Sequence, residues 1–106
     1  MRIIAKKVLL AFCEKHPIAR QSLLAWHEEA VKAIWMTPQD IKARYSSASF
    51  VDRNRVVFNI KGNDYRLIVA IDYHYGILLI KWLGTHKEYD RIDARKVDYD
   101  EDRYLG

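Results

Sequence analysis

The residues best suited to chemistry lie close together in the run Gly84-Thr85-His86-Lys87-Glu88-Tyr89-Asp90. Histidine transfers protons near neutral pH, and a tyrosine in a suitable environment can also serve as an acid or base. Because His86 and Tyr89 are three residues apart, they could share one face of a helical turn. The free N–H groups at the start of such a helix would attract an anion. The run therefore predicts acid–base chemistry on an anionic substrate.

Two further residues of this run have a structural explanation. Thr85-x-x-Glu88 matches a capping box, in which the two side chains bond to backbone N–H groups that lack partners at a helix start. We interpret Thr85 and Glu88 as the cap of a short helix. This interpretation leaves His86 and Tyr89 as the candidates for proton transfer.

Other kinds of catalytic site find little support in the sequence. His16, His27, His74 and His86 have no spacing typical of a zinc site, and Cys13 is the single cysteine. The glycines are scattered singly, so there is no glycine-rich phosphate loop, and no GxSxG nucleophile motif is present. We expect neither a metal nor a cofactor.

The charge of the chain is compatible with a nucleic acid partner. There are 18 Lys and Arg against 14 Asp and Glu, a formal net charge of +4, although an ordinary basic protein has the same balance. Cleaving RNA without a metal requires a group that takes the 2′-OH proton, a group that protonates the 5′-oxygen, and cations that stabilise the phosphorane-like charge. His86 and Tyr89 could move the protons, and Arg66 and Lys81 could supply the cations.

Helices are predicted for the first half of the chain. Met1–Ile4 is either a short strand or the lead into a helix, in which Val8, Leu9, Phe12 and Cys13 recur at helical spacing until His16-Pro17 ends it. The next helix presents a broad apolar stripe formed by Leu23, Leu24, Ala30, Val31 and Ile34. Thr37-Pro38 then predicts the start of a short helix that reaches about Arg44.

Strands are predicted for the second half, at Val56–Ile60, Tyr65–Asp72 and Ile77–Leu83. The turn signal Lys61-Gly62-Asn63-Asp64 joins the first two, and Tyr73–Gly76 joins the second and third. Helices followed by strands predict an α+β domain, with N-terminal helices packed on one face of a small antiparallel sheet.

Strand alternation assigns side chains to the two faces of this sheet. A two-residue turn at Gly62-Asn63 places Ile60 opposite Tyr65, Asn59 opposite Arg66 and Phe58 opposite Leu67. A second such turn at His74-Tyr75 places Ile68 opposite Lys81. The face toward the helices then carries Phe58, Leu67, Val69, Ile80 and Trp82. Asn59, Arg66 and Lys81 lie on the other face, outside the core, where they could receive an RNA backbone or be ordinary solvated side chains.

The length of 106 residues suits a single domain, which we expect to span residues 1–93. The remainder, residues 94–106, is expected to be a flexible tail whose acidic run Asp98-Tyr99-Asp100-Glu101-Asp102 could also fold back over the basic face or contact a partner. The N-terminus has no signal-peptide pattern, and the longest apolar run is Ile77–Ile80. We expect a soluble cytoplasmic protein without a membrane partner.

Two segments of the chain resemble a known family. Residues 57–67, read as VFNIKGNDYRL, and residues 84–90, read as GTHKEYD, are similar to the paired FNxxGNxxRL and THxEYD motifs of HigB-type toxins, a branch of the RelE-like mRNA interferases. The resemblance extends to about residue 93. It implies a RelE-like fold and a toxin that cleaves mRNA, often on the translating ribosome, without a cofactor. It also implies a HigA-type helix-turn-helix antitoxin, with operator DNA bound only through the toxin–antitoxin complex.

By motif position, the resemblance assigns Arg66, His86 and Tyr89 to the active site, and the strand argument adds Lys81 to this catalytic set. The candidate RNA-binding residues are Asn59, Arg66, Lys81 and Lys87. Asn59 and Asn63 both match the first motif, but the geometry of the turn and hairpin is the favoured explanation for them. Two alternatives stay open: a non-catalytic RNA- or ribosome-binding module, and an inactive toxin homologue retained for antitoxin binding.

Overall fold

The computed structural model describes residues 1–98 of the chain. In chain order its elements are β1 (Arg2–Ile4), α1 (Lys6–Lys15), the 3₁₀ turn η1 (Pro17–Ala19), α2 (Arg20–Lys32), α3 (Pro38–Arg44), β2 (Ser49–Val51), β3 (Arg55–Ile60), β4 (Tyr65–Asp72), β5 (Ile77–Thr85) and α4 (His86–Tyr89). Within these residues no helix combines the length and the apolar character needed to cross a membrane.

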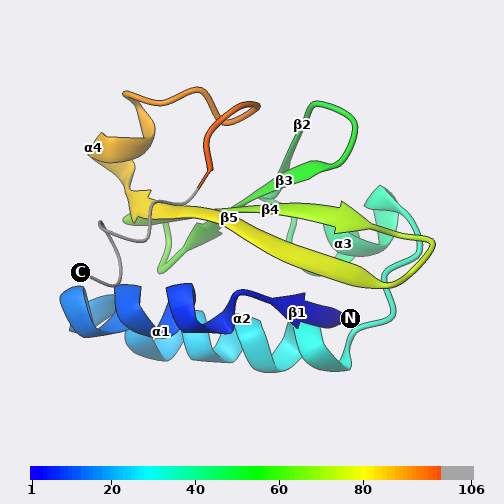
Figure 1. Cartoon of the computed structure of the whole chain (residues 1–106), viewed down its shortest axis with the longest axis horizontal. Helices are drawn as coiled ribbons and strands as arrows, with labels where there is room; N and C mark the ends of the chain where they lie inside the picture. The colour runs from blue at the N-terminus through cyan, green and yellow to red at the C-terminus, as the bar shows by residue number, and fades with distance from the viewer. Residues whose placement is uncertain (99–106) are drawn as a thin grey trace.

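The strands form one five-stranded sheet in the order β1-β5-β4-β3-β2, with α1 and α2 side by side under one face (Figure 1). This arrangement confirms the predicted α+β fold class. The expectation of an entirely antiparallel sheet is wrong at one edge, because β1 pairs with β5 in parallel. The other edge strand, β2, was not predicted and pairs antiparallel with β3.

The N-terminus holds β1 in its place beside β5. The ammonium of Met1 donates to the carbonyl oxygens of Ala30, Val31 and Ala33, at 3.0, 3.1 and 2.7 Å. Carbonyl groups in the last turn of a helix lack partners within the helix and carry its partial negative charge. The end of α2 therefore fixes the first residue, and with it the parallel edge strand.

The main core lies between the helices and the sheet. The helices contribute Val8, Leu9, Phe12, Cys13, Leu23, Trp26 and Ala30, and the sheet contributes Val56, Phe58, Leu67, Val69, Ile80 and Leu83. The predicted stripe of α2 is wrong at its end: Val31 is 48% exposed and Ile34 is 82% exposed. Ile34 lies beyond α2, which ends at Lys32, so the helical periodicity does not continue as far as this residue.

The predicted pairing of β3 with β4 is confirmed, from Ile60 opposite Tyr65 to Phe58 opposite Leu67. Counted from the turn between β4 and β5, their pairing agrees with the prediction only as far as Val69, which lies opposite Ile80. The register then shifts at a bulge, so that Ile68 lies opposite Trp82 rather than Lys81. Lys81 is the extra residue on β5.

The bulge moves Trp82 to the face of the sheet that α1 and α2 do not cover. There it forms a second, smaller core with Val57 and Ile68, while Leu83 joins the helix-side core. The expectation that Trp82 faces the helices is therefore wrong. Lys81 keeps its expected face, because a bulge places two successive side chains on the same side of a strand.

The chain after β5 covers this second core (Figure 1). Tyr89, Ile92, Ala94 and Val97 pack against it, and Arg55 Nη1 donates to the carbonyl oxygens of Ala94 at 3.1 Å and Val97 at 2.6 Å. The first residues of the expected tail thus contact the sheet. Of the acidic run 98–102, only Asp98 is among the described residues.

Candidate active site

The turn between β3 and β4 supports the site. Lys61 and Gly62 adopt the left-handed conformation, with φ of 53° and 64°. Glycine adopts it without a steric cost, which explains its presence at position 62. Asn63 is not among the residues with positive φ. A positive φ therefore does not account for the asparagine at position 63.

Asn63 instead connects the candidate site residues to one another through hydrogen bonds. Its carbonyl oxygen accepts hydrogen bonds from Arg66 Nη1 at 2.9 Å and from His86 Nδ1 at 3.1 Å. Its side-chain Oδ1 accepts from Arg66 Nη2 at 3.0 Å and from Asn59 Nδ2 at 3.3 Å. Residues of two strands and α4 thus meet at one asparagine.

Arg66 is buried, with only 8% of its surface exposed. Its Nη1 also donates to the carbonyl oxygen of Tyr65 at 3.2 Å, and its Cζ lies 5.5 Å from the ring centroid of Tyr89. Arg66 lies on the expected face and in neither hydrophobic core, but it is buried rather than solvated, with Tyr89 of α4 against its guanidinium. Among the described residues no carboxylate pairs with Arg66, so only neutral oxygens bond to this cation.

His86 is the first residue of α4. Because a carbonyl oxygen can only accept, Nδ1 of His86 carries the proton that bonds Asn63, and Nε2 of the neutral ring keeps its lone pair. Nε2 lies 3.6 Å from Oδ2 of Asp90, and the side chain is 46% exposed. Nε2 is therefore the atom of His86 that can exchange a proton with a substrate.

The predicted capping box orients His86 and Tyr89. Thr85 Oγ1 accepts from the backbone N–H of Glu88 at 3.2 Å, and Glu88 Oε1 accepts from that of Thr85 at 2.9 Å. The backbone N–H of His86 donates to the carbonyl oxygen of Asp64 at 3.0 Å. These bonds fix a helix of only four residues to the end of the sheet.

Gly84 helps to position Tyr89 through Trp82, a role that the sequence analysis missed. A Cβ atom at this position would lie 2.2 Å from Cη2 of Trp82, so the indole occupies the space that a side chain would need. The ring of Trp82 lies 6.4 Å from that of Tyr89, centroid to centroid. The glycine of the second motif therefore makes room for the aromatic residue on which Tyr89 rests.

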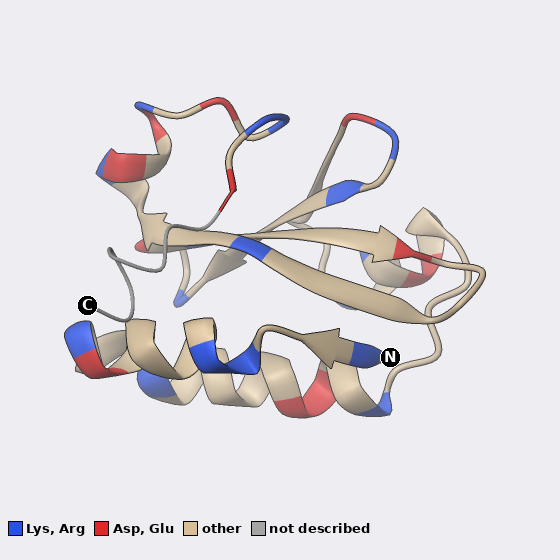
Figure 2. Cartoon of the chain, in the orientation of Figure 1, with Lys and Arg blue, Asp and Glu red and all other residues tan. Residues whose placement is uncertain are grey.

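The remaining predicted residues lie around this cluster. Asn59 bonds to Asn63, as described above. The ammonium of Lys81 pairs with Asp98 at 3.3 Å, and its side chain is only 19% exposed, so it is not on an open solvated surface. Lys87 is exposed. Figure 2 shows Lys and Arg in the helix layer and above the sheet, interspersed with Asp and Glu, rather than gathered on one face.

A surface pocket of about 500 Å³ adjoins His86. It is lined by Ile18, Lys61, Asn63, Asp64, Tyr65, Thr85, His86 and Lys87. Two lysines and an aromatic ring suit a nucleotide, since the ammonium groups attract phosphate and a ring can stack on a base.

Two other kinds of site find no support in the described residues. No three His, Cys, Asp or Glu side chains of residues 1–98 lie close enough together to hold a metal ion. Cys13 lies in the helix-side core, and burial raises the pKa of its thiol. A buried thiol with a raised pKa is a poor nucleophile.

Comparison with known proteins identifies the class of protein that carries this fold and site. Residues 19–92 match the family described as HigB toxin, RelE-like toxic component of a toxin–antitoxin system. The chain is 30% identical over 97 residues to the mRNA interferase toxin HigB of Escherichia coli (strain K12), an alignment that covers 89% of this chain and 92% of the relative. The mRNA interferases HigB of Escherichia coli O157:H7 and Shigella flexneri match equally well.

The chain therefore belongs to the HigB family of RelE-like toxins. The resemblance found in the two motifs is confirmed, and so is the RelE-like fold class. As the toxic component of a toxin–antitoxin system, a member of this family has an antitoxin as its partner.

Proposed function

We propose that this protein is an mRNA interferase, an endoribonuclease that inhibits translation by cleaving mRNA without a metal ion. The observation that carries the proposal is the carbonyl oxygen of Asn63, which bonds both His86 and Arg66. It brings a proton-transfer group beside a cation, with Tyr89 against the same guanidinium. The names of the three relatives support this activity.

The proposed reaction is an intramolecular transesterification. Nε2 of His86 takes the proton of the 2′-OH, and the resulting oxygen attacks the adjacent phosphorus. The bond from phosphorus to the 5′-oxygen breaks, and the hydroxyl of Tyr89 protonates this leaving group. Arg66 offsets the charge that accumulates on the phosphate oxygens. The products are a 2′,3′-cyclic phosphate and a 5′-OH end.

The remaining residues bind RNA in this proposal. Lys87 attracts phosphate at the pocket beside His86, and Lys81 does so on the sheet face when an RNA phosphate competes with Asp98. Asn59 acts through its bond to Asn63. The proposed setting is the translating ribosome in the cytoplasm. The proposed antitoxin is a HigA-type helix-turn-helix protein, through which alone the complex binds operator DNA.

The test is primer extension on mRNA from cells that express each variant. His86→Ala or Tyr89→Phe should lower cleavage by about 10²- to 10⁴-fold, because each removes an acid–base group. RNA binding should change much less. His74→Ala and Tyr75→Phe are matched controls, since both residues lie in the exposed β4–β5 turn; they should cleave like the wild type.

Other outcomes would decide between the proposals. Undiminished cleavage by the His86→Ala/Tyr89→Phe double variant would remove both residues from the mechanism. RNA binding by the wild type without any cleavage or growth arrest would indicate the non-catalytic module instead. Co-expression of the cognate antitoxin should restore growth.

A further inference from the structure

Asn63 has a defined amide orientation. An arginine side chain has only donors, so the Asn63 atom 3.0 Å from Arg66 Nη2 must be its oxygen. That oxygen in turn requires a donor from Asn59, which must present Nδ2. The hydrogen bonds therefore leave no ambiguity about which way either amide points.

The choice of an amide at position 63 has a consequence for charge. Aspartate has nearly the same shape and would offer Arg66 an ionised acceptor. It would also give the buried cation of Arg66 a counter-ion. A buried charge without a counter-ion is costly for the stability of the fold. The asparagine keeps the hydrogen bond and leaves the positive charge uncompensated among the described residues. Where the interior is poorly screened, such a charge acts more strongly on a nearby anion.

We infer that Asn63 is a positioning residue that fixes Arg66 beside His86 while leaving the charge of Arg66 available to the scissile phosphate. This inference rests on the proposed function. It explains why the side chain at a turn position without positive φ bonds to Arg66 rather than to the turn itself. A residue that served stability alone would lose nothing by becoming aspartate.

The experiment compares Asn63→Asp, Asn63→Ala and wild type in thermal unfolding, RNA cleavage and RNA binding at several salt concentrations. Cleavage is measured on a single-stranded RNA oligonucleotide, and binding on the same oligonucleotide with a 2′-deoxy substitution at the cleavage site, which removes the attacking hydroxyl and prevents cleavage. Asn63→Asp should unfold at the wild-type temperature or higher, yet cleave about 10- to 100-fold more slowly. Its plot of log affinity against log salt should be shallower by about 0.7, the value of one lost phosphate contact.

Two variants serve as comparisons. Asn54→Asp adds the same charge in the exposed turn before β3 and should cleave like the wild type. Asn63→Ala removes the acceptor without adding charge, so kcat should fall while the salt dependence stays that of the wild type. If Asn63→Asp fails to fold, Asn63→Ala decides, and a wild-type kcat in that variant overturns the inference.

The outcome can be separated from that of the proposed function. Wild-type cleavage and salt dependence in Asn63→Asp overturn the role of Asn63, provided that His86→Ala is inactive. If His86→Ala itself cleaves normally, the proposed function fails first.

Discussion

The two faces of the sheet are covered in different ways. On one face, α1 and α2 lie over a core that includes Phe58, Leu67 and Ile80. On the other, among residues 1–98, α4 and the segment after it pack with Val51 of β2 against Val57, Ile68 and Trp82. All the predicted catalytic side chains belong to the second face or to α4. We expect the helix-covered face to provide most of the stability of the fold. The less covered face can then hold buried polar groups such as Arg66.

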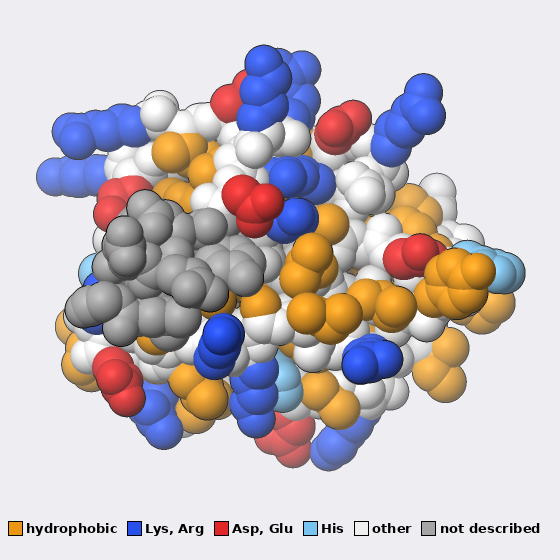
Figure 3. All heavy atoms as spheres, viewed as in Figure 1, with side chains coloured by type: hydrophobic (Ala, Val, Ile, Leu, Met, Phe, Trp, Pro, Cys, Tyr) orange, Lys and Arg blue, Asp and Glu red, His pale blue; other side chains and the backbone are white. Residues whose placement is uncertain are grey.

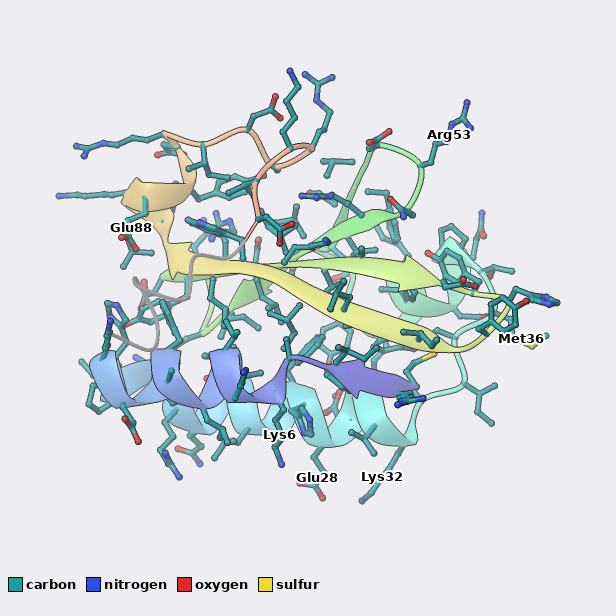
Figure 4. All side chains as sticks on the ribbon, viewed as in Figure 1. Lys6, Glu28, Lys32, Met36, Arg53 and Glu88 are labelled. Atoms are coloured by element: carbon teal, nitrogen blue, oxygen red, sulfur yellow. The ribbon has the colours of Figure 1, made fainter. Side chains whose placement is uncertain are left out.

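The two ends of the sheet differ as well. Exposed apolar side chains gather near the β4–β5 turn, where Ile34 is 82%, Tyr75 73% and Met36 69% exposed (Figure 3). Met36 lies at the opposite end of the molecule from Glu88 of α4 (Figure 4). The proposed chemistry uses none of these apolar residues, so the polar site and the apolar end are separate surfaces.

Two adjacent valines offer a direct comparison of the faces. Val56 is 1% exposed in the helix-side core, and Val57 is 2% exposed in the second core. Val56→Ala should lower the free energy of unfolding by about 2 to 3 kcal/mol, since the helices cannot close the cavity. Val57→Ala should cost about 1 to 1.5 kcal/mol, because the covering segment can settle into the space. Urea unfolding measures the loss of unfolding free energy in each variant. Equal losses would contradict the expectation that the helix-covered face provides most of the stability.

Much of the sheet could be predicted because its signals are local. Glycine in the first turn and β-branched residues on both sides of it determine the pairing of β3 with β4. The parallel pairing of β1 depends instead on the distant end of α2, and the bulge at Lys81 has no glycine or proline to indicate it. Such features depend on tertiary contacts, which a reading of neighbouring residues does not contain.

The candidate site was predicted as a set of residues but not as an arrangement. The structure brings Arg66, His86 and Tyr89 together, as the two motifs imply. The burial of Arg66 was missed because it depends on where α4 and the following segment lie. The central position of Asn63 was missed because its bonds depend on the conformation of the turn.

The cap of α4 should have an intermediate effect. Thr85→Ala removes the acceptor of the Glu88 N–H and should cost about 1 kcal/mol of stability, the usual value for a lost N-cap. Cleavage should fall at 37 °C and recover at low temperature, because the catalytic side chains are unchanged. Thr37→Ala, at the equivalent capping box of α3, is the matched control and should cost as much stability without a specific effect on kcat. A loss of kcat in Thr85→Ala that persists in the cold would indicate that Thr85 itself acts on the substrate.

The smallest effect is expected at the pair between Lys81 and Asp98. Asp98 is 58% exposed, so Asp98→Asn should change stability by less than about 1 kcal/mol. The freed ammonium of Lys81 should bind RNA phosphate more readily, raising affinity by about two- to threefold at low salt, with the difference vanishing at high salt. Asp52→Asn makes the same change of charge in the turn before β3, where asparagine tolerates the positive φ of 58°. If both variants bind RNA equally, the gain reflects net charge alone; if only Asp98→Asn gains, the second face of the sheet takes part in RNA binding.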